Sequence, residues 1–176
     1  MVERVDTIAI LERAHSLANE AMFTVALQCR RIKTVEPEDE TFIFRWWVDF
    51  QFLILALCRL RRAVKIAHKV PAITGDVKVA LHKFDRALPH LIRLRNVGEH
   101  IDEYVVDSES RHDKTVEHKG LQVGNWNGTI YEWLDIQLNV HDALVAAEEL
   151  YGVLQSTRKE LSTKGVNASS IPDGSV

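Results

Sequence analysis

The sequence is poor in cysteine and has no long uninterrupted hydrophobic run. Its two cysteines, Cys29 and Cys58, form no CxxC pair and fall within helical patterns. Reduced thiols packed as small apolar groups are typical of a cytoplasmic protein. The most apolar segment, residues 42–58, is interrupted by Arg45 and Asp49, which are four residues apart and can pair on one helix face. Because the remaining apolar stretch is too short to cross a bilayer, we expect a cytoplasmic protein without membrane contact.

Several motifs of common enzyme classes are also missing. The sequence contains no GxGxxG, Walker, GxSxG or HExxH motif, so nucleotide-dependent and serine-hydrolase chemistry have no support. The formal net charge of −3 argues against a protein whose entire surface binds nucleic acid, although it permits a local basic patch. Histidine, by contrast, is abundant, with eight in 176 residues. Acid–base chemistry and metal binding therefore both need to be considered.

Hydrophobic periodicity predicts four long helices. In residues 3–33, apolar or small side chains recur at alternating steps of three and four, as in an amphipathic helix. A second helical pattern covers about 39–69. A third starts near Asp76 and continues to Val105 in the same register, so Pro89 predicts a kink or two coaxial pieces rather than a stop. The fourth pattern covers about 141–161.

A β-hairpin signal precedes the last helix. An Asn-Gly pair stands between alternating β-forming residues and predicts a hairpin over about 121–138. A two-stranded hairpin is marginal alone, so we expect Trp126 and Trp133 to attach it to the helices. The predicted fold is therefore mainly all-α, a four-long-helix bundle with an inserted hairpin. Residues 1–162 would form one domain and 163–176 a disordered tail.

The densest group of chemically versatile side chains lies on the third helix. On a helical wheel, Asn96 and His100 point away from the apolar seam, while Arg95 and Glu99 lie on one flank. The simplest interpretation is a solvated outer face on which Arg95 and Glu99 pair, with Gly98 allowing a neighbouring helix to approach. However, asparagine and histidine are weak helix formers, so their presence inside a helix suggests a further role.

The segment RNVGEH, from Arg95 to His100, resembles the Rx4-6H motif of the HEPN superfamily, in the form in which a polar residue follows the arginine. HEPN domains are small all-α bundles, and many are metal-independent ribonucleases of toxin–antitoxin and defence systems. They commonly dimerise so that two copies of the motif face each other. The resemblance therefore implies RNA as substrate, a homodimer, an antitoxin protein as a possible partner, and no cofactor.

The resemblance also implies roles for individual residues. Arg95 would bind phosphate or stabilise the charge that builds up as the RNA 2′-oxygen attacks, and His100 would be the general acid or base. Asn96 would orient the phosphate or His100, with Glu99 and Tyr104 in supporting positions. On an ideal helix, Arg95 and His100 point about 140° apart. They would converge only through a long Arg95 side chain, a helix distortion, or a partner chain.

A cationic stretch on the second helix is a candidate for holding an RNA backbone. Residues 59–69 contain arginines and lysines but no acid. The simpler explanation is that cations gather near a helix C-terminus because the macrodipole favours them there. The candidate RNA-binding residues are Arg59, Arg62, Lys65 and Lys69, with Arg61 beside them.

Two other functions stay open. Trp46 and Trp47 point about 100° apart on a helix, and one helix of a small bundle cannot easily bury both. They could therefore form, with Phe50 and Phe52, a surface for a second copy or another protein, in a bundle that is not catalytic. A metal-binding bundle is suggested by the ExxH spacings Glu12–His15 and Glu109–His112. Since His15 falls in an apolar seam, a hydrogen-bonded core histidine is the simpler explanation.

Overall fold

The computed structural model describes residues 7–41, 44–106, 109, 113–117 and 121–168. The helices in these ranges are α1 (Thr7–Lys33), α2 (Arg45–Ala67), α3 (Thr74–Ala87), α4 (Leu91–Glu99), α5 (Ile101–Val105) and α6 (Val140–Ala168). The short 3-10 helices are η1 (Pro37–Glu40) and η2 (Pro71–Ile73), and the strands are β1 (Asn125–Trp126), β2 (Ile130–Trp133) and β3 (Ile136–Asn139). The predicted fold class, a helical bundle with a β-element before the last helix, is confirmed.

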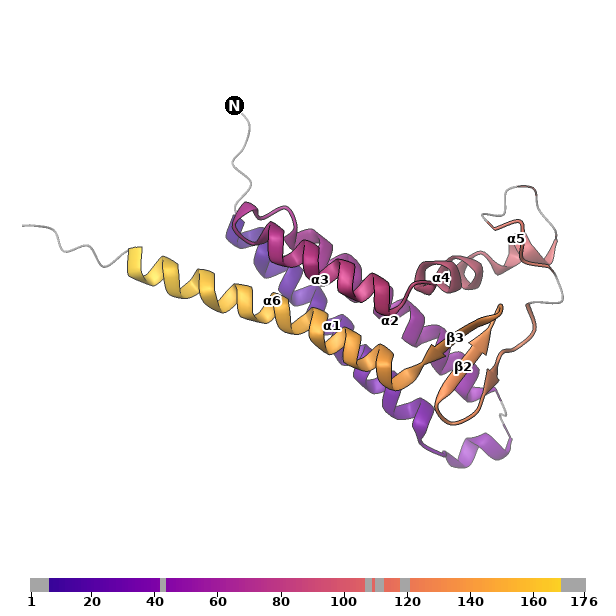
Figure 1. Cartoon of the computed structure of the whole chain (residues 1–176). Coiled ribbons are helices and arrows are strands. Elements are labelled where there is room, and N and C mark those ends of the chain that lie inside the picture. The colour runs from indigo at the N-terminus through magenta and orange to yellow at the C-terminus, as the bar shows by residue number, and fades with distance from the viewer. Residues whose placement is uncertain (1–6, 42–43, 107–108, 110–112, 118–120, 169–176) are drawn as a thin grey trace, which may run out of the picture.

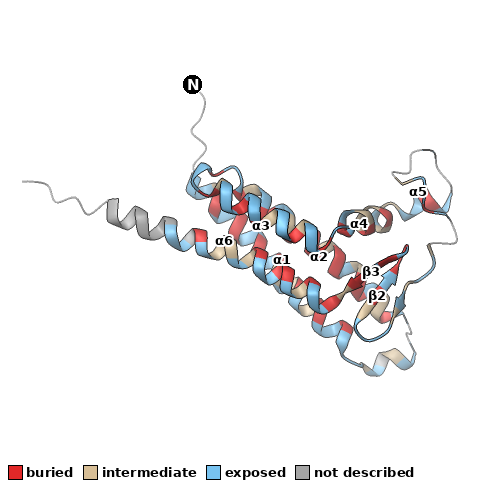
Figure 2. Ribbon diagram, in the orientation of Figure 1, coloured by how far each residue is buried: buried red, intermediate tan, exposed pale blue. Residues whose placement is uncertain are grey.

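Four helices form the long bundle, and the sheet covers one end of it. α1, α2, α3 and α6 run alongside one another, while α4 and α5 continue past α3 toward the sheet (Figure 1). The faces that meet are buried and the outer faces are exposed (Figure 2). On α2, the predicted apolar seam is buried along the length of the helix, at Phe50, Leu53, Leu57, Leu60, Val64 and Ala67. Burial of one face explains why the period of the sequence predicted these helices.

Two helix starts differ from the prediction. The second long helix begins at Arg45 instead of near residue 39, because Pro37–Glu40 form a separate 3-10 helix. The third begins at Thr74, which leaves Asp76 inside the first turn rather than at the N-cap. The Thr74 hydroxyl donates to the carbonyl oxygens of His68 and Val70, both at 2.9 Å, and so joins this start to the preceding turn.

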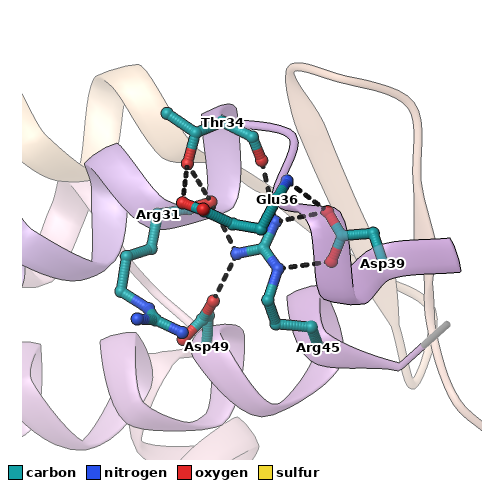
Figure 3. Close-up of polar contacts among 6 residues, drawn as sticks. All are labelled: Arg31, Thr34, Glu36, Asp39, Arg45 and Asp49. Atoms are coloured by element: carbon teal, nitrogen blue, oxygen red, sulfur yellow. Dashed lines mark hydrogen bonds and ion pairs between the residues drawn. The ribbon is translucent and has the colours of Figure 1, made fainter. Parts of the chain in front are cut away.

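The buried arginine of α2 explains the delayed start of that helix. Arg45 is 7 % exposed, and its guanidinium donates to Asp39 at 2.5 and 2.9 Å and to Asp49 at 2.9 Å (Figure 3). It also donates to the carbonyl oxygens of Arg31 and Thr34, at 2.9 and 2.7 Å, which lie at the C-terminal end of α1. The predicted Arg45–Asp49 pair is thus confirmed, within a larger network that joins α1, η1 and α2.

The third predicted helix is divided into three pieces. α3 ends before Pro89, as the two-piece alternative expected, and a second interruption at His100 separates α4 from α5. This second break was not predicted, and it changes which residues are buried. The expected seam residues Ile101 and Val105 are exposed, and Tyr104 is buried instead. His100 leaves the α-helical region, with φ −117° and ψ 32°, so the register before it does not continue after it.

The predicted hairpin is present, but the sheet has a third strand. Gly128 adopts φ +92° in the turn between β1 and β2, as expected for the Asn-Gly signal. A second tight turn then joins β2 to β3 through Leu134 and Asp135, at φ 55° and 60°. Aspartate often takes this left-handed conformation but leucine rarely does, so the sequence pattern missed the turn. The result is an antiparallel sheet in the order β1-β2-β3.

Aromatic side chains attach the sheet to α2. Tyr131 stacks on Phe50 with ring centroids 4.0 Å apart, and Trp126 contacts Phe50 edge-on at 5.1 Å. Trp133 contacts Trp47 at 5.1 Å. The expectation that Trp126 and Trp133 attach the β-element to the bundle is therefore confirmed.

The same contacts answer the question raised by the adjacent tryptophans of α2. The ring centroid of Trp46 lies 6.5 Å from that of Tyr131, and the ring centroid of Trp47 lies 5.9 Å from the same point. Both indoles are partly buried by the sheet of their own chain. The adjacent tryptophans therefore need no second subunit to cover them.

The last helix is longer than predicted. α6 starts at Val140, where the Asn139 side chain accepts hydrogen bonds from the backbone N–H groups of His141 and Asp142 at 2.9 and 3.3 Å. It ends at Ala168, beyond the predicted end near 161 and inside the segment predicted as a tail. Residues 169–176 of that segment lie outside the described residues. Over the described ranges, no helix combines the length and apolar character needed to cross a membrane.

Candidate functional site

Packing on α2 determines which α4 side chains face outward. Leu91, Leu94 and Val97 of α4 are buried, and α4 lies against α2. The residues between them, Arg95 and Asn96, are therefore left half-buried at the surface. His100 follows at the joint between α4 and α5, also half-buried. The predicted motif thus lies along one accessible edge of the molecule.

Gly98 brings this edge close to α2. A Cβ atom added at Gly98 would lie 2.7 Å from Oε1 of Gln51 and 4.0 Å from Cη2 of Trp133. A side chain there would displace the flexible end of the Gln51 side chain, so Gly98 lies in contact with that residue of α2. This glycine therefore helps determine the position of the motif relative to α2 and the sheet.

Arg95 is held by its neighbours on α4. Its Nη1 donates to Oδ1 of Asn96 at 2.9 Å, and its Nη2 lies 3.4 Å from Oε2 of Glu99. The Arg95 side chain is 22 % exposed. The predicted Arg95–Glu99 pair is present, as the interpretation of a solvated helix face expected. In the free protein the guanidinium is therefore oriented by an amide and neutralised by a carboxylate.

His100 contacts a different carboxylate, which the sequence interpretation had not selected. Nδ1 of His100 lies 3.4 Å from Oε1 of Glu103, and the backbone N–H of Glu103 donates to the His100 carbonyl at 3.0 Å. The His100 side chain is 38 % exposed. The only sequence signal was the three-residue spacing, which is too common in helices to identify a site. These contacts divide the motif into an Arg95 group and a His100–Glu103 pair.

Tyr104 lies beneath the surface of the motif. Its side chain is 2 % exposed, and its hydroxyl accepts the backbone N–H of Asp113 at 3.0 Å. Asp113 in turn pairs with Arg93 at 2.6 Å. Hydrogen bonds from Thr115 and from Arg93 lower the pKa of the Asp113 carboxyl. Tyr104 therefore joins α5 to the segment that follows it, with its hydroxyl directed at backbone.

The cationic stretch of α2 separates into paired and unpaired residues. Arg61 forms a two-point contact with Asp85 of α3, at 2.6 and 2.7 Å. Within the described residues, the four RNA-binding candidates form no ion pair, and all are exposed: Arg59, Arg62, Lys65 and Lys69. Unpaired, exposed cations remain free to contact an anionic ligand.

Cys58 on α2 is a buried thiol. Burial raises its pKa to about 11, and the positive charges of Arg62, Arg95 and Arg61 oppose that rise.

A groove lies between α1 and α2. It has a volume of about 370 Å³. Its walls combine apolar residues with Arg59 and Arg62, and its lining is completed by Leu17, Glu20, Ala21, Thr24, Ala63 and Ile66. Two of the unpaired arginines therefore line an open groove.

The metal-binding alternative finds no support in the described side chains. Among them, no three His, Cys, Asp or Glu residues are grouped so that they could hold a metal ion. His15 is 2 % exposed on the buried face of α1, and its ring centroid lies 6.4 Å from that of Tyr151. Of the second ExxH spacing, His112 lies outside the described residues.

Comparisons with protein-family models, with curated proteins and with solved structures found no match for this chain.

Proposed function

We propose that this protein is a HEPN-like, metal-independent endoribonuclease. The observation that carries the proposal is the placement of the motif: Arg95 and His100 are both partly exposed, and each is paired with a carboxylate of its own. A guanidinium, an imidazole and further unpaired cations are the groups needed to bind and cleave a phosphodiester. RNA is the proposed substrate because its 2′-hydroxyl supplies an internal nucleophile.

In the proposed reaction, the RNA 2′-oxygen forms a bond to the adjacent phosphorus and the bond from phosphorus to the 5′-oxygen breaks. His100 takes the proton from the 2′-hydroxyl and returns a proton to the departing 5′-oxygen. Arg95 stabilises the charge on the phosphate oxygens, and Asn96 orients Arg95 through their 2.9 Å hydrogen bond. The products are a 2′,3′-cyclic phosphate and a 5′-hydroxyl.

Binding of RNA would rearrange the charges around Arg95. In the free protein Glu99 pairs with this arginine at 3.4 Å, so a phosphate must compete with that carboxylate. Arg59, Arg62 and Lys65 would hold the flanking backbone by charge alone. Such binding is independent of base sequence and weakens as salt concentration rises.

The product chemistry tests this proposal directly. A defined RNA oligonucleotide is incubated with the protein in EDTA, beside the same oligonucleotide carrying a single 2′-deoxy substitution at the cleavage position. We expect cleavage of the first with a 2′,3′-cyclic phosphate product, and no cleavage of the second at that position. Cleavage of the 2′-deoxy position, or activity that EDTA abolishes, would contradict the proposed reaction.

The cellular setting proposed for this activity is that of a toxin or defence component in the cytoplasm, with a homodimer as the active form and an antitoxin protein as partner. Induced expression in a heterologous host tests the toxin role. Growth should stop with the wild-type chain and continue with His100→Ala at equal protein level. Equal growth in both cases would contradict it.

A second candidate function, a protein-interaction module, is favoured by exposed apolar residues on α2. Phe44, Val48 and Phe52 recur every fourth residue and are 45, 37 and 51 % exposed. This surface replaces the one expected from Trp46 and Trp47, which the sheet covers. Apolar side chains lined up on one helix face are typical of a contact surface.

The oligomeric state tests this second candidate. Sedimentation analysis should show a dimer for the wild type and a monomer for Phe52→Ser if a second copy covers the surface. The matched control is Phe23→Ser, which changes a phenylalanine that is also exposed but lies on α1. A wild-type monomer at high concentration would contradict self-association through α2.

A further inference from the structure

We propose that Glu103 is the positioning residue of His100, holding its imidazole with Nδ1 inward and Nε2 toward the substrate. The contact itself is a property of the chain, but its consequence for cleavage rests on the proposed function. Glu103 was not selected from the sequence, where Glu99, next to His100, was the expected supporting carboxylate.

The helix break places these two side chains together. α4 ends at Glu99 and α5 begins at Ile101, so His100 occupies the joint and Glu103 the first turn after it. A backbone hydrogen bond of 3.0 Å from the Glu103 N–H to the His100 carbonyl closes this turn. Oε1 of Glu103 then lies 3.4 Å from Nδ1 of His100. The pairing therefore follows from local backbone geometry.

Burial makes the Glu103 carboxylate a strong partner for the imidazole. The side chain is 26 % exposed, and its second oxygen, Oε2, is buried without a hydrogen-bond partner among the described residues. A carboxylate that is partly removed from water gains more from a hydrogen-bond donor than an exposed one does. Nδ1 of His100, 3.4 Å from Oε1, is the ring nitrogen that this structure places against the carboxylate.

The other nearby carboxylate is committed elsewhere. Oε2 of Glu99 lies 3.4 Å from Nη2 of Arg95, on the preceding helix. Each of the two proposed catalytic groups thus has its own acid: Glu99 accompanies the guanidinium and Glu103 the imidazole. Glu99 is also more exposed than Glu103, at 41 %, so water screens its charge more effectively.

This arrangement specifies which imidazole nitrogen does the chemistry. A proton kept on Nδ1 by Glu103 leaves the lone pair of neutral His100 on Nε2. Nε2 then takes the proton of the 2′-hydroxyl as the bond from the 2′-oxygen to phosphorus forms. The same nitrogen gives a proton to the 5′-oxygen as its bond to phosphorus breaks, which returns His100 to its starting form. Between these events, the Glu103 carboxylate stabilises the imidazolium and stays unprotonated.

Nitrogen NMR of the full-length chain tests the contact without RNA. The ¹⁵N shifts of His100 at alkaline pH report which nitrogen of the neutral ring carries the proton. We expect the Nδ1–H form in the wild type and in Glu103→Gln, whose amide oxygen can still accept the bond, and a shift to the Nε2–H form in Glu103→Ala. The control, Glu99→Gln, should match the wild type. The same tautomer in Glu103→Ala and in the wild type would overturn the proposal.

Cleavage kinetics test the consequence with the same variants, after circular dichroism has shown that each is folded. Glu103→Ala should lower kcat roughly tenfold or more with little change in KM, because His100 is misplaced while the phosphate contacts remain. Glu103→Gln should recover part of that loss. If kcat is unchanged in a Glu103→Ala variant that cleaves RNA through His100, Glu103 has no positioning role. If the wild type cuts no RNA but the tautomer depends on Glu103, the contact stands and the ribonuclease function fails.

Discussion

Gly98 on α4 lies so close to Gln51 on α2 that a methyl group at Gly98 would be 2.7 Å from the Gln51 side-chain oxygen. This approach sets the position of the motif, because Arg95 and His100 stand on either side of the glycine. It also brings α4 against α2, on which the unpaired Arg62 lies.

A double-mutant cycle measures the closeness of α4 and α2. Gly98→Ala should change the free energy of unfolding by less than about 1 kcal/mol, since the displacement of the flexible Gln51 side chain offsets the roughly 1 kcal/mol that alanine gains in helix propensity. In a Gln51→Ala background the same change should be neutral or stabilising. Gly152→Ala, where no atom lies within 4 Å of the added group, is the control and should stabilise. Urea denaturation of the set provides the values, and equal effects of Gly98→Ala in both backgrounds would contradict the close contact.

The Arg45 network predicts how stability depends on acid. The hydrogen bond from Arg45 lowers the pKa of Asp39 from 3.8 to about 2. A carboxyl with a lowered pKa in the folded state contributes stability above its unfolded pKa and loses it as the pH falls toward the folded value. Asp39→Asn should therefore destabilise the protein at neutral pH and have progressively less effect between pH 4 and pH 2.

Thermal unfolding across this pH range provides the comparison for Asp39→Asn. Glu40→Gln, which removes an exposed negative charge from the next position of η1, is the control. A difference between Asp39→Asn and wild type that stays constant down to pH 2 would be inconsistent with the network.

At the contact between the sheet and α2, the ring and the hydroxyl of Tyr131 contribute differently to stability. The ring stacks on Phe50. The buried hydroxyl has no partner with hydrogen-bond geometry among the described residues. Burial raises the pKa of this hydroxyl, and the nearby Gln51 side chain opposes that rise only in part. Tyr131→Phe should thus change the free energy of unfolding by less than about 1 kcal/mol. Tyr131→Ala should cost about 3–5 kcal/mol, as for other large aromatic truncations. A large loss in Tyr131→Phe would show that the hydroxyl has a strong partner.

The two neighbouring arginines of α2 make a matched pair for RNA binding. Arg62→Ala should weaken RNA binding, because this exposed arginine forms no ion pair within the described ranges. The slope of log Kd against the logarithm of the salt concentration should fall by about 1, the value for one lost phosphate contact. Arg61→Ala should leave RNA affinity nearly unchanged, since Arg61 is already bound to Asp85 at 2.6 Å. Titrations with a labelled single-stranded RNA at several salt concentrations decide the matter. Equal losses in the two variants would refute a specific contact by Arg62.

The helices that bury one face were predictable from the sequence, and the breaks in them were less so. On α2 each seam residue after the tryptophans is buried, because burial imposes the helical period on the sequence. The break at His100 has no comparable signal, since Gly98 lies two residues earlier and permits a helix to continue. Its consequence, Tyr104 turning inward in place of Ile101 and Val105, therefore followed only from the structure.

Side-chain pairing in the motif was predictable only where spacing alone determines it. Arg95 and Glu99 are four apart within one helix, and they pair as expected. Glu103 contacts His100 at a three-residue spacing, which occurs so often in helices that it does not identify a site. The third strand was missed because Leu134, the first residue of its turn, adopts a left-handed conformation that leucine rarely takes.

The measurement that tests the central claim most directly compares RNA cleavage in EDTA by the wild type, His100→Ala and His82→Ala, each matched for thermal stability. His82 is an exposed histidine on α3 and controls for the loss of an imidazole elsewhere. The account predicts cleavage by the wild type and His82→Ala, and a loss of at least about 100-fold in His100→Ala. Equal cleavage by His100→Ala and wild type, or no cleavage of a broad RNA pool by the wild type, would contradict it.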